Sequence, residues 1–216
     1  MQDAKHHESR TDFQLERPIF FSDGVFAICI TLLVIEIRVP SLAEHTDSAL
    51  VAYLSHTSLK FFGFLLSFYI IAHYWMVHHR IFGYVKKTTG MLLWLNLIFL
   101  LTVILLPFSS GMFGEYGSDI DMQVPYLIYV TNMCLTGMAN CWLWIYVSNP
   151  KRDLLTHEIP PARIRLGIIR SLIIPFVFIV SLLFSLVFPV VSRFIPLLIP
   201  FILNYGLKGL EKKAFS

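Results

Sequence analysis

The chain has 216 residues, of which 56% are hydrophobic and 14% charged, and its mean hydropathy is +0.68. Soluble domains carry about 25% charged residues, so this composition excludes an ordinary soluble fold and indicates an all-α membrane protein with several spans. The net charge is only +3 and the basic residues stand at the ends of apolar segments, so we expect no nucleic-acid partner.

Six apolar segments follow one another along the chain. A transmembrane helix needs about 20 apolar residues. The last segment is shorter and contains Pro196 and Pro200, so it is either a full crossing or a re-entrant segment, and the basic residues favour a crossing. We expect one transmembrane domain over residues 1–216. Its predicted spans are 18–37, 59–82, 90–108, 124–147, 166–190 and 194–207.

The basic residues are divided unevenly between the two sets of loops. If the N-terminus is cytoplasmic, the outer side holds only Arg38, Lys60 and Arg193 of the 17 Lys and Arg residues. Cytoplasmic loops are enriched in Lys and Arg. We therefore expect both termini and the loop 149–166 in the cytoplasm, and a location in the plasma or inner membrane.

A cleavable signal peptide is the alternative interpretation of the first segment. Its apolar stretch is longer than the 7–15 residues that are typical of a signal peptide's core, and it contains Asp23. A membrane span is therefore favoured. The cysteines, Cys29, Cys134 and Cys141, all lie within apolar segments, so we expect no disulfide, no metal site and no cofactor.

Asp23 is an ionisable residue inside the first span. If Pro18 occupies the first helical turn, Asp23 lies about 8 Å into the helix, where a charge is costly unless it is paired. His78 and Asn96 lie at similar depths in the second and third spans. These side chains either hold the helices together through hydrogen bonds, which is the commoner role, or form a proton-sensitive or ion-coordinating site.

The first span also has an apolar face. At 100° per residue, Thr31, Leu32 and Ile35 all project within about 60° of Ile28, whereas Asp23 projects about 140° away from it. Taken alone, such a face is typical of contact with lipid or with other helices.

The beginning of the first span carries a motif. Arg17-x-x-x-Phe21-Ser22-Asp23 resembles the RxxxFSD signature of the transmembrane protein 175 family. The following residues as far as Glu36 also resemble the first helix of that family. The resemblance covers the whole chain, although the last two segments carry no motif that matches. It implies a single six-span unit that assembles as a homotetramer, as in the prokaryotic members.

The second and third spans extend the resemblance. Trp75-x-x-His78-His79-x-x-Phe82 and Asn96 are similar to the family's pattern in these helices. The resemblance implies an interhelical network that shapes the pore. The residues that match this network or its motif are Arg17, Phe21, Ser22, Asp23, Trp75, His78 and Asn96.

The resemblance also implies a potassium-selective cation channel whose pore is lined by the first helix of each subunit. The family's aliphatic constriction maps onto Ile28, with Leu32 and Ile35 one and two turns further out, and Thr31 matches a hydroxyl layer. Potassium would pass close to Ile28 and Thr31 as the permeant ion and not as a cofactor. The TVGYG filter of other potassium channels is absent from the sequence.

A transporter or proton channel and an enzyme are the two other classes of function that ionisable residues in the spans suggest. A proton-coupled secondary transporter or a proton-conducting channel is the alternative, because intramembrane Asp and His residues form proton relays, but no inverted repeat is visible. An enzyme is not expected. The spacings of His73, His78 and His79 do not match the i, i+4 arrangement that would bring metal ligands together on one helical face.

Overall fold

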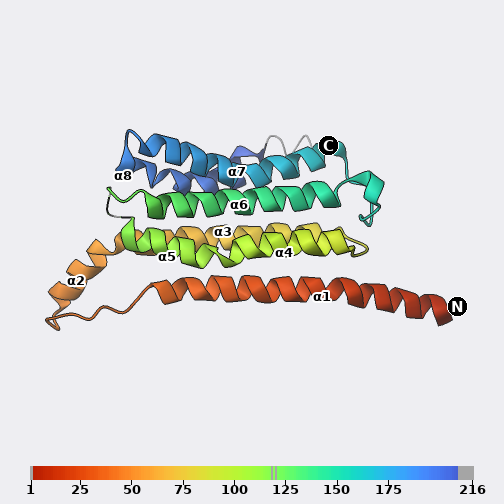
Figure 1. Ribbon diagram of the computed structural model, residues 1–216, viewed down its shortest axis with the longest axis horizontal. Coiled ribbons are helices and arrows are strands. Elements are labelled where there is room, and N and C mark those ends of the chain that lie inside the picture. Colours follow the sequence, from red (N-terminus) through yellow and green to blue (C-terminus); the bar gives the residue numbers. More distant parts are fainter. Residues whose placement is uncertain (1, 118, 120, 209–216) are drawn as a thin grey trace.

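The computed structural model describes residues 2–117, 119 and 121–208, which form helices, connecting loops and one isolated antiparallel bridge between Val85 and Leu155. The long helices lie in layers (Figure 1), and α6 lies between α4 and α5 on one side and α7 on the other. The layers comprise α1 (Gln2–Leu32), then α3 (Ser58–Gly83), α4 (Gly90–Ile104) and α5 (Leu106–Tyr116), then α6 (Val124–Val147), then α7 (Pro161–Ser185).

Five stretches of the described residues are long and apolar enough to cross a membrane. These stretches are Leu15–Glu36, Lys60–Gly83, Gly90–Tyr116, Pro161–Ser185 and Pro189–Gly206. The 24-residue α6 is not among them, because it carries several Tyr, Trp and Asn residues. Neighbouring helices bury much of its surface, including Asn132 and Asn140. The expected all-α membrane fold is confirmed.

The helix α1 begins earlier than the predicted span 18–37. It starts at Gln2, so Pro18 lies inside the helix and not in its first turn. The preceding residues are rich in Gln, Glu, Lys and Arg, which favour helix but are invisible to a search for apolar segments. After Leu32 the chain continues as a 3₁₀ turn, Leu33–Glu36. Beyond a loop, the short helix α2 (Asp47–His56) leans away from the other helices (Figure 1).

The predicted span 90–108 consists of two helices. Thr89 caps α4 by accepting a hydrogen bond from the backbone N–H of Leu92 at 3.2 Å. The helix ends at Ile104, and α5 then runs from Leu106 to Tyr116. Pro107, in the first turn of α5, has no N–H to continue the α4 hydrogen-bond ladder. This break explains the boundary, and the second helix extends eight residues past the predicted end.

Glycines bring α6 and α7 close together. A Cβ on Gly137 would collide with the ring of Pro175, and a Cβ on Gly167 would collide with the indole of Trp144. The indole Nε1 donates a hydrogen bond to the carbonyl of Ile164 at 3.0 Å. Small residues allow such close approach between membrane helices. The α7 helix starts at Pro161, so the end of the expected loop 149–166 is helical, and the earlier part contains a 3₁₀ turn, Pro150–Arg152.

The last predicted segment, 194–207, is a series of short helical pieces. The α7 helix ends at Ser185, before the predicted 190, and the next stretch begins at Pro189. Prolines at 189, 196 and 200 interrupt a regular helix because each lacks an N–H donor. The pieces are α8 (Pro189–Ser192), a 3₁₀ turn (Ile195–Leu197), α9 (Leu198–Phe201) and a π-helical turn (Ile202–Gly206).

Candidate functional site

The helix α1 has two different faces. Ser22, Phe26 and Cys29 of α1 and Leu33 of the following 3₁₀ turn, at intervals of three or four residues, are buried against the other helices. The opposite face, which continues from α1 into this turn, holds the predicted pore residues, and it is open in the single chain. Their exposed fractions are 59% for Ile28, 40% for Leu32 and 64% for Ile35.

Thr31 is also exposed on this open face. Its hydroxyl turns back to its own helix, with the carbonyl oxygens of Ala27 and Ile28 at 3.0 and 2.9 Å. The hydroxyl oxygen retains lone pairs that can accept hydrogen bonds or contact a cation. The open face therefore combines three aliphatic side chains with one oxygen.

Three of the predicted network residues form one buried chain of hydrogen bonds. His78 Nε2 lies 2.8 Å from Asn96 Oδ1, and Asn96 Nδ2 donates to Ser22 Oγ at 3.0 Å. The Ser22 hydroxyl in turn donates to the carbonyl of Pro18 at 2.7 Å. An amide oxygen can only accept, so His78 Nε2 is the donor in the first bond. The chain joins α3 and α4 to α1 through side chains that are at most 2% exposed.

The imidazole of His78 is surrounded by aromatic rings. Its ring centroid lies 4.4 Å from that of Phe82 in a stacked arrangement, 5.6 Å from Phe26 and 5.9 Å from Phe99. These rings keep water from the imidazole, so a broken bond to Asn96 would leave a buried polar group without a partner. Such a group costs about 1–3 kcal/mol.

Asp23 belongs to a second, separate contact. The indole Nε1 of Trp75 donates to Asp23 Oδ1 at 2.9 Å, and both side chains are partly exposed. Phe21 is 57% exposed, and Arg17 is exposed as well. The structure thus brings together Ser22, His78 and Asn96 in one group and Asp23 with Trp75 in another.

Polar residues at the other end of α1 were not singled out by sequence reasoning. The side chain of Glu36 packs so closely on Gly111 of α5 that an added Cβ would lie 2.5 Å from Glu36 Oε2. Nearby, Lys60 Nζ of α3 pairs with Glu115 Oε2 of α5 at 2.5 Å. The two glycines at i and i+3 in α5, Gly111 and Gly114, were the available signal, because they mark a face on which other groups can approach the backbone.

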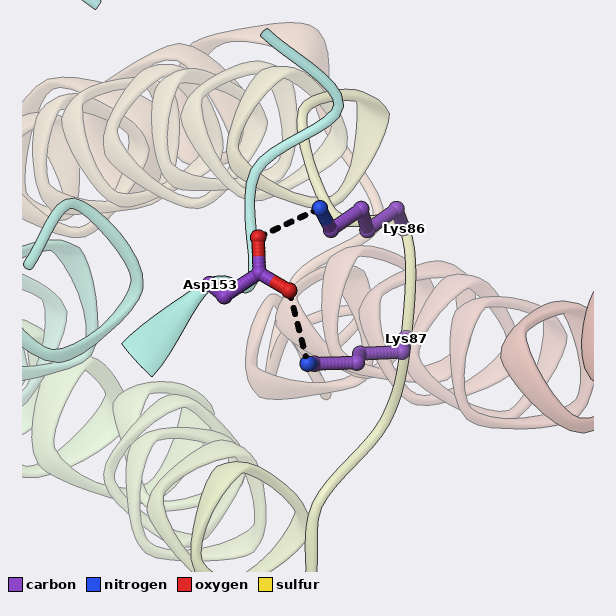
Figure 2. A network of polar contacts seen from close by, with 3 residues as sticks. All are labelled: Lys86, Lys87 and Asp153. Atoms are coloured by element: carbon purple, nitrogen blue, oxygen red, sulfur yellow. Dashed lines mark hydrogen bonds and ion pairs between the residues drawn. The ribbon is translucent and has the colours of Figure 1, made fainter. Parts of the chain in front are cut away.

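Charged residues also link two loops at the end of the molecule where α3 ends. Asp153 lies between two lysines (Figure 2), with Oδ1 2.5 Å from Lys86 Nζ and Oδ2 3.1 Å from Lys87 Nζ. The hydrogen bond from Lys86 has the largest effect on the Asp153 carboxyl and lowers its pKa below the ordinary value. The hydrogen bond from Lys87 and the positive charges of both lysines lower this pKa further. Backbone bonds between the loops, Lys86 N to Leu154 O and Thr156 N to Tyr84 O, are both 2.8 Å long.

The part of the chain that contains this site matches a known protein family. Residues 17–107 match the family described as "Endosomal/lysosomal potassium channel TMEM175". This match spans α1, α3 and α4 and therefore contains both hydrogen-bonded groups and the open face of α1.

Individual relatives show the same similarity. A potassium channel of Chamaesiphon minutus is 34% identical over 134 residues, which cover 62% of this chain and 66% of the relative. A potassium channel of Streptomyces collinus is 33% identical over 129 residues, or 59% of this chain and 62% of the relative. The matches thus cover less than two thirds of each relative's length.

A solved structure extends the comparison to the fold. The crystal structure described as a lysosomal potassium-selective channel TMEM175 homolog from Chamaesiphon minutus has a TM-score of 0.72 with this chain and 26% sequence identity. The superposition covers 88% of this chain and 98% of the other. The likeness therefore reaches beyond α4, into the later part of the chain, where the sequence carries no matching motif.

Proposed function

We propose that this chain, which belongs to the TMEM175 family, forms a potassium-permeable and potassium-selective channel. The bacterial relatives named above are potassium channels, and the similar solved structure is described as potassium-selective. The observation that carries the proposal is the open apolar face of α1, since Ile28, Leu32 and Ile35 point away from the helices that bury the opposite face.

The proposed pore is formed by a homotetramer. One α1 helix cannot enclose a path for ions, but four copies around a symmetry axis can each present the open face. In this arrangement Ile28 forms the narrowest ring, Leu32 and Ile35 form wider rings, and Thr31 offers a hydroxyl oxygen. Rings of aliphatic side chains restrict water and ions, and potassium, which is less strongly hydrated than sodium, would pass with the smaller loss of hydration.

The two hydrogen-bonded groups set the position of α1 in this proposal. The Ser22–Asn96–His78 chain ties the helix to α3 and α4, and the Asp23–Trp75 bond adds a second tie to α3. We assign Arg17 and Phe21 to the same motif without a role at the narrowest point. Substitutions in these groups would therefore alter the pore through the angle and rotation of α1.

The proposed topology has six crossings with both termini in the cytoplasm of a plasma or inner membrane. Support comes from the five candidate spans, the length of α6 and the unequal distribution of basic residues. Cysteines placed at the exposed positions Asp121 and Arg165 in a cysteine-free background test it. An impermeant thiol reagent added outside should modify residue 121 alone, and external modification of residue 165 would refute this orientation.

A proton-coupled transporter or a proton-conducting channel is the second candidate. Its specific support is the buried imidazole of His78 at the end of a hydrogen-bonded chain. It is less well supported, because the bacterial relatives are named potassium channels. We propose transport and not catalysis as the role of the chain, in keeping with a family of channels.

Recording from the purified full-length protein in a planar bilayer, with potassium on one side and sodium on the other, tests the function. A channel of the proposed kind gives unitary currents whose reversal potential lies far from zero, with the sign that opposes the flow of potassium. Reversal close to zero would reject potassium selectivity. A current that follows the proton gradient, measured by changing the pH on one side, would favour the second candidate.

A further inference from the structure

A cavity of about 90 Å³ lies between α3, α6 and α7, and among the residues that the structure describes its lining includes none from α1. Its volume equals that of about three water molecules in the liquid. Three arginines line it: Arg80 from α3, and Arg163 and Arg170 from α7. The rest of the wall is mainly apolar or aromatic, and it includes Tyr84 and Trp144.

The spacing on α7 explains why the two arginines share the cavity. Arg163, Gly167 and Arg170 are related by i, i+4 and i+7, so they lie along one face of the helix. Gly167 leaves room for the indole of Trp144, and the indole is held by its hydrogen bond to Ile164. The indole therefore packs on α7 at Gly167, which lies between Arg163 and Arg170 in the helix.

The charges around the cavity favour an anionic ligand. Arg80 and Arg170 come from different helices and line the same small cavity, so their like charges repel each other. Guanidinium groups bind phosphate oxygens through paired hydrogen bonds. Arg163 and Arg170 are half-buried and Arg80 is exposed, so the site is open to a ligand from outside the bundle.

The position of the cavity points to the membrane as the source of that ligand. Tyr84 in its wall accepts a hydrogen bond from Thr156, in the loop that Asp153 ties to Lys86 and Lys87 (Figure 2), so the cavity lies at the basic end of the bundle. On the same helix as Arg170, the side chains of Ile169 and Phe176 are 42% and 66% exposed. Basic pockets between helices at the cytoplasmic side of a membrane suit anionic lipid headgroups.

We propose that this cavity binds the phosphate group of an anionic membrane lipid. The phosphate lies between Arg80, Arg163 and Arg170, and the acyl chains lie along the exposed apolar side of α7. A free phosphate ion shares the recognition chemistry, but the apolar walls and the adjoining apolar surface favour the lipid. The inference goes beyond ion conduction and does not depend on it.

Native mass spectrometry of the full-length protein in detergent, titrated with dioleoylphosphatidylglycerol, tests the proposal. We expect saturable binding of one lipid per chain and weaker binding of dioleoylphosphatidylcholine. Arg163→Gln and Arg170→Gln should each weaken binding of the anionic lipid about fivefold, which corresponds to about 1 kcal/mol per basic residue. If either variant fails to fold, Arg80→Gln, at an exposed position, supplies the comparison.

Arg165→Gln is the matched control, because Arg165 lies on the same helix, is exposed and does not line the cavity. Its affinity for the anionic lipid should change less than twofold. An equal loss in Arg165→Gln, or equal binding of the two lipids, would show a general surface effect and overturn the proposal. Displacement of the lipid by inorganic phosphate at millimolar concentration would assign the site to a free anion and also overturn it.

Discussion

Asn96 connects three helices because its side-chain amide both accepts a hydrogen bond and donates one. The depths of Asp23, His78 and Asn96 in their spans could be predicted from the sequence, since depth follows from the rise per residue. Their directions could not, because the rotation of each helix is set by packing against its neighbours. This is why the pairing of Asp23 with Trp75, apart from the buried chain, emerges only in three dimensions.

A double-mutant cycle tests the buried chain. Asn96→Leu removes both of its side-chain hydrogen bonds and leaves His78 Nε2 among aromatic rings, so it should lower the free energy of unfolding by about 1–3 kcal/mol. Ser22→Ala alone should cost less, because it removes the bonds of the hydroxyl to Asn96 and to the Pro18 carbonyl but keeps the buried bond between Asn96 and His78. Unfolding in mixed micelles should show a coupling of at least about 0.5 kcal/mol between the two changes. Strictly additive losses would contradict a direct bond.

The Asp153 carboxylate provides a pH-dependent contact outside the membrane spans. Its pKa is lowered in the folded protein by Lys86 and Lys87, so its stabilising effect is present above the ordinary carboxyl pKa of about 4 and is lost as the pH falls through the lower folded value. Asp153→Asn removes the charge and still suits the left-handed backbone, φ 49°. Wild type should melt above this variant at pH 7 in low salt.

The difference in melting temperature between wild type and Asp153→Asn should shrink as the pH falls below the ordinary carboxyl pKa of about 4, and it should disappear once the carboxyl is protonated in the folded chain as well as in the unfolded chain. Because the variant keeps every other titratable group, the difference between the two melting temperatures cancels the effect of acid on those groups. High salt should also reduce the difference, because both lysine contacts are exposed. A difference that persists unchanged into acid would mean that the ion pairs do not stabilise the loops.

At the scale of elements, hydropathy located the long helices but not their irregular ends. Hydropathy missed the beginning of α1 because the residues there are largely polar or charged. It also missed the break at Leu105, because Pro107 begins a new helix there while the apolar segment continues. The polar side chains of α6 are tolerated because other helices cover them. Apolar content therefore predicts which segments meet lipid better than it predicts which segments form the centre of the bundle.

Close contact between α6 and α7 depends on glycine. Gly137→Ala should lower the free energy of unfolding by about 1–3 kcal/mol, because its Cβ would enter space held by Pro175 and the backbone carbonyl of Ser171. Gly83→Ala is the control, since nothing lies within 4 Å of its added Cβ. The control should be neutral or slightly stabilising because alanine favours helix. Equal melting temperatures for the two variants would show that the contact adapts without cost.

For the whole molecule, the sequence motif led to the family, and the helical face led to the candidate pore residues. Neither the motif nor the helical face shows what lies opposite Ile28, Leu32 and Ile35, because a pore between identical subunits is formed only when several chains come together. In one chain Ile28, Leu32 and Ile35 are simply exposed. The family resemblance and the open face point to the same residues, and a pore lining and a lipid contact at these residues predict different effects of substitution on conduction.

Substitution of the narrowest ring makes that distinction. In the proposed tetramer, Ile28→Asn replaces an aliphatic ring by amides of similar size that can hydrogen-bond to water and ions, which opposes dewetting. If each channel's wet state gains about 1 kcal/mol, the ratio of open to closed times rises about fivefold. The potassium-to-sodium permeability ratio should fall as well, since ions would no longer need to shed water at an apolar ring.

Ile179→Asn is the matched control for this experiment. Ile179 lies on α7 and is 46% exposed, so the same chemical change is made on a helix outside the proposed pore. Single-channel records should then show a longer open time and weaker potassium preference in Ile28→Asn, and neither change in Ile179→Asn. Unaltered gating and selectivity in a well-folded Ile28→Asn tetramer would place the constriction elsewhere, because a polar ring at the narrowest point must change how water and ions occupy it.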